Sequence, residues 1–289
     1  MNTITRQEYK NQKRAFDLMG FNYIDHRDKR IINYVSRSLK GINTGAFVSS
    51  GTISYTDALV GSLDYVKVLG TEVHSKVSSF VNTLSLKEMN PVNNGYTCFV
   101  TYSYDPDAKK VNETSGNVGH YKVPLNPDSM ASIHLGHEHI HAMKETNYEE
   151  YKDGQVLGDV ITMLYEFILA DTHPELKKDI YRFRLSTLKE DFKHYENAVA
   201  QMNKSKQDKD LYKIIATRSG QYLNSYYYAV ILFNLYKDNP DVILELVNKV
   251  LNHEMTTREM LESLNLLYQL NDVVYDNELN LVKSSIKKL

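Results

Sequence analysis

The chain is poor in the residues that disulfides and cysteine-rich metal clusters require. Its 289 residues include a single cysteine, Cys98, and no tryptophan. One cysteine excludes an internal disulfide and a zinc cluster built from several thiolates, a pattern typical of reducing compartments. No stretch reaches the ~18 consecutive apolar residues of a transmembrane helix, and the N-terminal residues lack the apolar core of a signal peptide. We therefore expect a cytoplasmic protein that is not embedded in a membrane.

The chain also lacks a large net charge. Its formal net charge is −2 at pH 7, which gives no reason to expect a nucleic acid or an anionic membrane as partner. The hydrophobic fraction of 42% and the charged fraction of 24% are ordinary for a globular protein. With neither internal repeats nor low-complexity linkers, residues 1–289 are expected to form one compact domain.

Periodicity predicts a mainly α fold with one small β element. We expect an N-terminal helical part in residues 1–90, with a long helix starting near Thr56, and a β element in residues 91–126. Residues 96–104 and 118–125 are rich in β-branched and aromatic side chains and predict an antiparallel hairpin or ribbon. A helix pair in residues 127–171 and a C-terminal helical part in residues 172–289 follow. The expected helices span residues 128–146, 149–171, 175–204, 207–238, 241–253, 257–271 and 275–287.

The stretch SIHLGHEHIHAMKE, residues 132–145, can be interpreted in two ways. As a strand it would place three alternate histidines on one face, whereas as a helix it contains H-E-x-x-H. The preceding Asn126, Pro127 and Asp128 are a typical helix start, and Met130, Ile133, His137 and Ile140 recur at helical spacing. The helix is therefore the favoured interpretation.

On a helix, His137 and His141 project from one face and can together bind a divalent metal. Glu138 lies beside them as a candidate general base for water activation. His139 points away, and His134 is expected to be a partly buried or surface histidine. A histidine-rich surface helix without metal is the alternative.

A catalytic zinc ion needs a third protein ligand and an open position for water. Asp159 and Glu166 fall seven residues apart within the apolar stripe of the next predicted helix, so both face inward. If residues 146–148 form the corner of an antiparallel pair, the histidines lie about 12 Å from it, Asp159 about 16 Å and Glu166 about 27 Å. Asp159 is therefore the first candidate ligand, and Glu166 the second or a group that orients a histidine. Core ion pairs are the alternative for both.

Together these residues resemble the H-E-x-x-H zinc metallopeptidases of the gluzincin-like type, and in particular the thimet oligopeptidase and oligoendopeptidase F family. NGYTCFVTY and HYKVPLN are similar to its strands before the metal helix, GHEHIHAMK to that helix, and GDVITMLYE to its ligand segment. The family has Glu where this chain has Asp159, and Glu166 lies nearer the usual distance from His141. The long N-terminal helical region of the family is mostly absent.

The resemblance also extends to TRSGQYLNSYYYAVILF, where the family has tyrosines that hydrogen-bond the substrate oxyanion. It implies that Tyr222 or Tyr226 has this role, with Tyr227 completing the spacing, although an aromatic core face is the alternative. The whole set predicts a zincin-like, helical, Zn²⁺-dependent peptidase for short or unfolded peptides, in which His137, His141 and Asp159 or Glu166 bind the metal. Mn²⁺ or Co²⁺ would suit the same ligands. The rivals are a metal-dependent hydrolase of another amide and a non-catalytic helical binding protein.

Overall fold

The computed structural model describes residues 6–42, 51–83, 100–113, 117–118, 128, 130–204, 208–267 and 270–287. The predicted mainly α fold with a small β element is confirmed. Its helices are α1 Arg6–Met19, α2 His26–Ser38, α3 Tyr55–Val66, η1 Lys67–Leu69, α4 Thr71–Thr83, α5 Ala131–Glu145, α6 Tyr148–Leu157, α7 Val160–Thr172, α8 Pro174–Lys204, α9 Lys209–Asp238, α10 Pro240–Leu251, α11 Thr257–Ser263 and α12 Asp272–Lys287.

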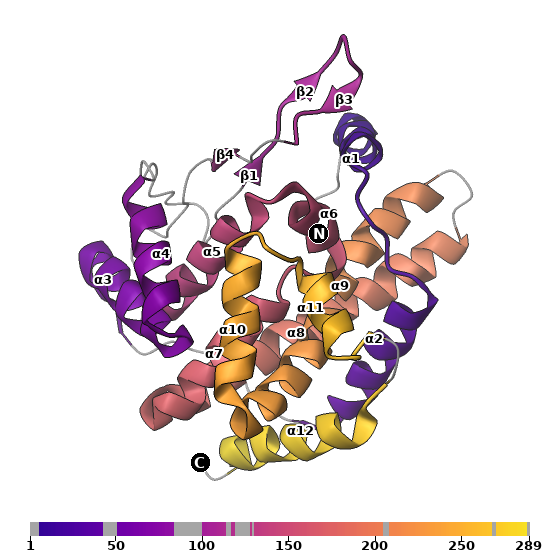
Figure 1. The fold of residues 1–289 in the computed structure, drawn as a ribbon. Helices are drawn as coiled ribbons and strands as arrows, with labels where there is room; N and C mark the ends of the chain where they lie inside the picture. Colours follow the sequence, from indigo (N-terminus) through magenta and orange to yellow (C-terminus); the bar gives the residue numbers. More distant parts are fainter. Residues whose placement is uncertain are drawn as a thin grey trace.

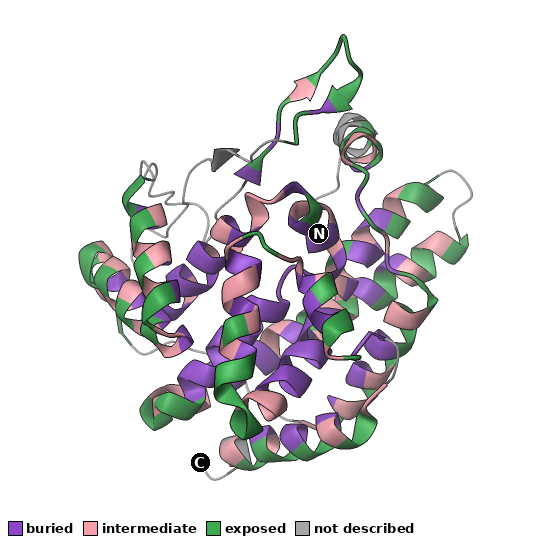
Figure 2. Ribbon diagram, viewed as in Figure 1, coloured by how far each residue is buried: buried purple, intermediate pink, exposed green. Residues whose placement is uncertain are grey.

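The core forms around α7 and α9. Every residue of α7 from Val160 to Ala170 is buried, and α9 is continuously buried from Leu223 to Phe233. Helices α2, α6, α7, α8, α10 and α12 pack around α9 (Figure 1). Figure 2 shows the buried ribbon in the interior and the exposed faces on the outer helices. A helix that is apolar on all sides must be enclosed in this way.

The β element is a thin antiparallel ribbon that projects beside α1 (Figure 1). β1 Val100–Thr101 pairs with β4 Asn117–Val118, and β2 Tyr104–Asp105 pairs with β3 Lys110–Val111. The connection between the two predicted strands therefore contains a second pair of strands. It is closed by a turn in which Asp105 Oδ1 accepts hydrogen bonds from the amides of Asp107 and Ala108. The predicted strand at residues 118–125 lies almost entirely outside the described residues.

Two predicted continuous helices are interrupted, and these predictions were wrong. The helix expected from Thr56 ends at Val66 and resumes as α4 after Gly70, whose φ of +100° suits only glycine. The helix expected over residues 149–171 is divided into α6 and α7 at Gly158 and Asp159. A β-carbon at Gly158 would lie 2.5 Å from the carbonyl oxygen of Gly154, so the tight turn at this break requires glycine.

Two helix ends also differ from the prediction. Helix α5 begins at Ala131, three residues after the expected start, and Asp128 Oδ1 accepts a hydrogen bond from the amide of Met130. The predicted cap residue Asn126 and Pro127 lie outside the described residues. Helix α11 begins with the expected capping box of Thr256 and Glu259 but ends at Ser263, because Asn265 takes a φ of +57° that terminates the helix.

No helix within the described ranges combines the length and the apolar character that a bilayer crossing demands.

Candidate metal centre

The imidazoles of His137 and His141 face the same side of α5, one turn apart, with ring centroids separated by 5.5 Å. Both rings direct Nε2 toward one oxygen of Asp159. The distances from Asp159 Oδ1 are 3.2 Å to His137 Nε2 and 3.6 Å to His141 Nε2. One donor atom from each of the three residues therefore lies within 4.8 Å of the other two. This convergence is the geometry that a shared cation requires.

Asp159 reaches the histidines from the break between α6 and α7. Its backbone amide donates to Ser225 Oγ at 3.3 Å, and its second carboxylate oxygen accepts from Gln221 Nε2 at 2.8 Å. Both partners come from α9. The interruption at Gly158 thus places Asp159 between the metal-helix candidate α5 and α9, and leaves Oδ1 directed at the two imidazoles.

The other ring nitrogens are also held by carboxylates. His137 Nδ1 lies 2.8 Å from Glu166 Oε1, and Arg184 of α8 binds both oxygens of Glu166, with Arg184 Nε 2.9 Å from Oε2. His141 Nδ1 lies 2.9 Å from Glu145 Oε1. When the rings are neutral and each Nδ1–H donates to its carboxylate, each Nε2 presents its lone pair to the space beside Asp159.

The charges of this cluster do not balance. Three carboxylates, those of Asp159, Glu145 and Glu166, face one guanidinium, that of Arg184, so two negative charges remain when both histidines are neutral. Their side chains are at most 17% exposed. A buried excess of negative charge is costly unless protons or a metal ion compensate it.

The pKa values follow this excess. Burial lowers the pKa of His141, but the carboxylates of Glu145 and Asp159 outweigh burial and raise that pKa to about 10. Burial likewise raises the pKa of Glu166, but the Arg184 guanidinium lowers it to about 2. The pKa of His137 is also raised, by Asp159 and Glu166 against burial. The space between these groups therefore favours positive charge.

The donor set fits a divalent cation. Two imidazole nitrogens and one carboxylate oxygen form the ligand set of catalytic zinc sites, and two positive charges equal the excess negative charge. Glu166 would then hold the imidazole of His137 in orientation, in agreement with its predicted alternative role. Which of the two acids binds a metal stays a prediction, but only Asp159 faces both Nε2 atoms.

Glu138 and Tyr222 lie at the rim of this cluster. Both are half-buried, and the carboxylates of Asp159 and Glu138 help to raise the pKa of the Tyr222 phenol, together with burial. Tyr222 therefore stays protonated and can donate a hydrogen bond at neutral pH. It lies next to Gln221, which binds Asp159.

The other candidate tyrosines lie in the core. Tyr226 is fully buried and packs edge-to-face against Phe167 and Tyr275. Tyr227 is also fully buried, and its hydroxyl oxygen accepts a hydrogen bond from the backbone amide of Asn271. The predicted aromatic face is therefore present at both positions, one helical turn from the rim where Tyr222 lies.

The remaining histidines of α5 are not part of the cluster. His139 is fully buried and contacts Ser62 Oγ at 3.0 Å, on the side of α5 away from Asp159. Burial lowers its pKa to about 3, so it is neutral. His134 packs against Phe183, with ring centroids 4.4 Å apart. Helix phase thus leaves His137 and His141 as the two histidines of α5 whose donor atoms converge with Asp159.

Sequence reasoning missed three residues of the cluster: Glu145, Arg184 and Gln221. Glu145 is one turn after His141, which is a spacing that brings side chains together and could have identified it. Gln221 precedes the candidate Tyr222 directly. Arg184 has no local signal, because it reaches Glu166 from a separate helix.

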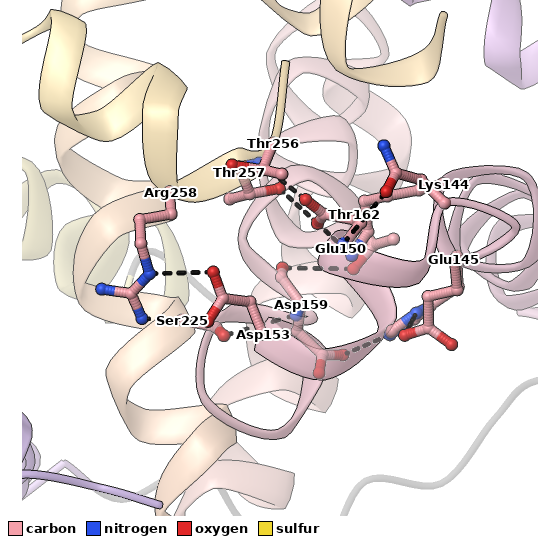
Figure 3. Close-up of polar contacts among 12 residues, drawn as sticks. Lys144, Glu145, Glu150, Asp153, Asp159, Thr162, Ser225, Thr256, Thr257 and Arg258 are labelled. Atoms are coloured by element: carbon pink, nitrogen blue, oxygen red, sulfur yellow. Dashed lines mark hydrogen bonds and ion pairs between the residues drawn. The ribbon is translucent and has the colours of Figure 1, made fainter. Parts of the chain in front are cut away.

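A second buried polar cluster, here named the Lys144 clamp, joins α5 to α6 and α11. It consists of Lys144, Glu150 and Thr257. Lys144 Nζ lies 2.8 Å from Glu150 Oε1, and Thr257 donates to Glu150 through its amide and its hydroxyl, each at 2.6 Å. Figure 3 shows Glu150 between the other two and, nearby, the pair of Asp153 and Arg258 at 2.8 Å. These contacts fix the end of α5 close to the cluster of His137, His141 and Asp159.

Comparison with known proteins shows a similarity of fold but no similarity of sequence that identifies a family. No family model matches the chain, and no curated protein matches it either. The chain is similar to the crystal structure of "a putative oligoendopeptidase F from Bacillus anthracis str. Ames", with a TM-score of 0.52 and 12% sequence identity. The match covers 100% of this chain and 57% of the other, so the chain spans little more than half of that protein. The helical fold is thus of the oligoendopeptidase kind.

Proposed function

We propose that the protein is a zinc-dependent peptidase acting on short or unfolded peptides. The observation that carries this proposal is the convergence of His137 Nε2, His141 Nε2 and Asp159 Oδ1 within 4.8 Å, in a buried cluster with two excess negative charges. The similarity of the fold to an oligoendopeptidase F structure supports peptide as the substrate class.

In this proposal His137, His141 and Asp159 hold the ion, while Glu166 and Arg184 fix the orientation of His137. When bound, Zn²⁺ supplies Lewis acidity toward a carbonyl oxygen and acidifies water. Glu166 is fully engaged by His137 and Arg184, which leaves it no oxygen directed at the histidine Nε2 atoms. Asp159 is therefore preferred as the third ligand.

Two residues of this chain carry out the proton transfer and the stabilisation of the oxyanion. Glu138 accepts a proton from the attacking water and delivers it to the leaving amine as the peptide bond breaks. The Tyr222 phenol, kept protonated by the surrounding carboxylates, donates a hydrogen bond to the oxygen that becomes negative in the transition state. Tyr226 is too deep in the core to reach the substrate directly, so this role rests on Tyr222.

The peptide itself is expected to lie alongside the ribbon before α5. An extended peptide can add to a free strand edge through backbone hydrogen bonds. We expect residues 119–123, which lie outside the described residues, to offer this edge.

The test combines metal analysis with one substitution. Protein purified without a polyhistidine tag should contain about one zinc ion per chain by elemental mass spectrometry, and should cleave quenched fluorescent peptides. Glu138→Gln should keep the zinc and lose about 10²–10⁴-fold in kcat/KM, and Tyr222→Phe about 10²–10³-fold.

The outcomes separate the rivals. Protein that binds no metal would favour a non-catalytic helical binding protein. Zinc-loaded protein that cuts no peptide of a broad panel would favour hydrolysis of another amide. Unchanged cleavage by Glu138→Gln would contradict the proposed mechanism.

A further inference from the structure

The carboxylate of Glu145 occupies a space shaped to hold it against His141. Glu145 Oε1 lies 2.9 Å from His141 Nδ1, and the Glu145 side chain is only 17% exposed. Gly154 of α6 faces the same oxygen: a β-carbon at Gly154 would lie 3.1 Å from Glu145 Oε1, closer than ordinary van der Waals contact. The absence of a side chain at Gly154 therefore leaves the room that the Glu145 carboxylate fills.

The backbone at Glu145 is fixed independently of its carboxylate. Its carbonyl oxygen accepts a hydrogen bond from Tyr102 Oη at 2.8 Å, which ties the segment after β1 to the end of α5. The preceding residue, Lys144, is held by Glu150. With the Glu145 carbonyl and the neighbouring Lys144 side chain both held, the position of Glu145 at the end of α5 does not depend on its carboxylate.

The two carboxylates on the imidazoles differ in their own partners. Glu166 is bound at both oxygens by Arg184, whereas Lys144, the cation next to Glu145, is bound to Glu150. Glu145 therefore shares less of its negative charge with a cation and should make His141 the more basic of the two imidazole donors. Carboxylates that accept the far N–H of a ligating histidine fix its orientation and raise its basicity.

We propose that Glu145 is the positioning residue of His141, and that Gly154 is the residue that gives it room, so that both set the affinity of the centre for zinc. This inference rests on the proposed function, because it assumes that His141 binds the ion. It adds a role for two residues that contact neither substrate nor metal.

The test measures zinc affinity by competition with a chelating indicator. Glu145→Gln should weaken binding of Zn²⁺ by about 10–100-fold, because the neutral amide lowers the basicity of His141. Glu149→Gln is the matched control, since Glu149 is four residues further along, exposed, and forms an ion pair with Lys152. The absorption spectrum of the Co²⁺-loaded protein should change with Glu145→Gln and not with the control, because it reports the ligand geometry.

Gly154→Ala provides a second variant that separates affinity from stability. Alanine is the better helix former, which offsets the cost of moving the Glu145 carboxylate, so the metal-free protein should unfold in urea at a midpoint close to that of wild type. Its β-carbon displaces the Glu145 carboxylate, so Zn²⁺ affinity should fall several-fold. A general loss of structure cannot produce this combination, which keeps the proposal testable if Glu145→Gln folds poorly.

The possible failures are distinguishable. Wild-type protein that binds no zinc would overturn the proposed function, and the role of Glu145 with it. Wild-type protein that binds zinc, with unchanged affinity in Glu145→Gln and Gly154→Ala, would overturn only the positioning role.

Discussion

Two buried polar clusters lie next to each other on α5, and they are built differently. The Lys144 clamp contains one cation and one anion, and Glu150 accepts hydrogen bonds from Lys144 and twice from Thr257. The proposed metal centre contains three carboxylates and one guanidinium around two imidazoles. The clamp is complete with the protein's own groups, whereas the centre needs added positive charge.

This difference separates a structural role from a functional one. A buried pair that satisfies its own charges and hydrogen bonds holds elements together and needs no ligand. A buried cluster with excess charge of one sign, with several donor atoms directed at one point, is what a site for a counter-ion requires. Burial alone does not distinguish the two clusters, because Lys144 and Glu150 are as buried as Asp159 and Glu166.

Breaking the clamp should have the largest effect on stability. Glu150→Gln leaves the Lys144 ammonium buried without its anion, and we expect a loss of about 3–5 kcal/mol in the free energy of unfolding. Urea denaturation of the metal-free protein measures it. The exposed Glu149→Gln should change stability by less than about 0.5 kcal/mol. A loss below 1 kcal/mol for Glu150→Gln, on the order of a surface change, would show that the clamp is not a closed pair.

Binding of zinc at the proposed centre should stabilise the folded protein by less than the clamp does. At free zinc about 100 times its Kd, binding adds about 2.7 kcal/mol, which corresponds to a rise in Tm of roughly 5 °C or more. Asp159→Asn should abolish this zinc-dependent rise, whereas Asp171→Asn, an exposed carboxylate of α7, should keep it. A rise of equal size in Asp159→Asn would place the ion elsewhere.

Overpacking the contact between α5 and α7 should lower the free energy of unfolding by about 1–3 kcal/mol. Gly136 lies against Tyr165, and a β-carbon there would lie 2.4 Å from Tyr165 Oη. Gly136→Ala should therefore destabilise the protein although alanine favours the helix. Tyr165→Phe should be nearly neutral alone, because its buried hydroxyl has no hydrogen-bond partner in the described part of the chain. It should also recover part of the loss in the double variant, as measured by a double-mutant cycle in urea. Purely additive effects would exclude the steric explanation.

The smallest expected effect concerns Asp28, a half-buried carboxylate outside both clusters. Burial, aided by the neighbouring Asp25 carboxylate, raises the pKa of Asp28 to about 6. Between its ordinary value of 3.8 and about 6, the folded protein keeps a proton that the unfolded chain has lost, so stability falls as pH rises through this window. Because Asp28 is half-buried, we expect a contribution on the order of 1 kcal/mol. Asp28→Asn should flatten the pH dependence of urea stability between pH 4 and 6, and an unchanged slope would contradict this assignment.

Local rules predicted the parts of the fold that depend on neighbours in sequence. Helical periodicity indicated the strongly amphipathic or apolar helices, and it separated His137 and His141 from His139 on α5. It failed at Gly158, where an apolar stripe continues through a break, because the pattern records which residues are buried and not whether the backbone between them turns. The ion pair of Arg184 with Glu166 was also out of reach, since it joins two helices.

By itself, the sequence determined the helix that carries the two imidazoles, their common face and the candidate acids seven residues apart. Only the tertiary structure shows that those acids face different nitrogens of the histidines. The turn at Gly158, the hydrogen bond that Gln221 donates to the Asp159 carboxylate and the one that the Asp159 amide donates to Ser225 direct Asp159 toward both Nε2 atoms. Arg184 instead holds Glu166 on the far nitrogen of His137. The physical reason is that a metal site depends on the meeting of atoms from several helices, and periodicity along one helix does not specify where another helix lies.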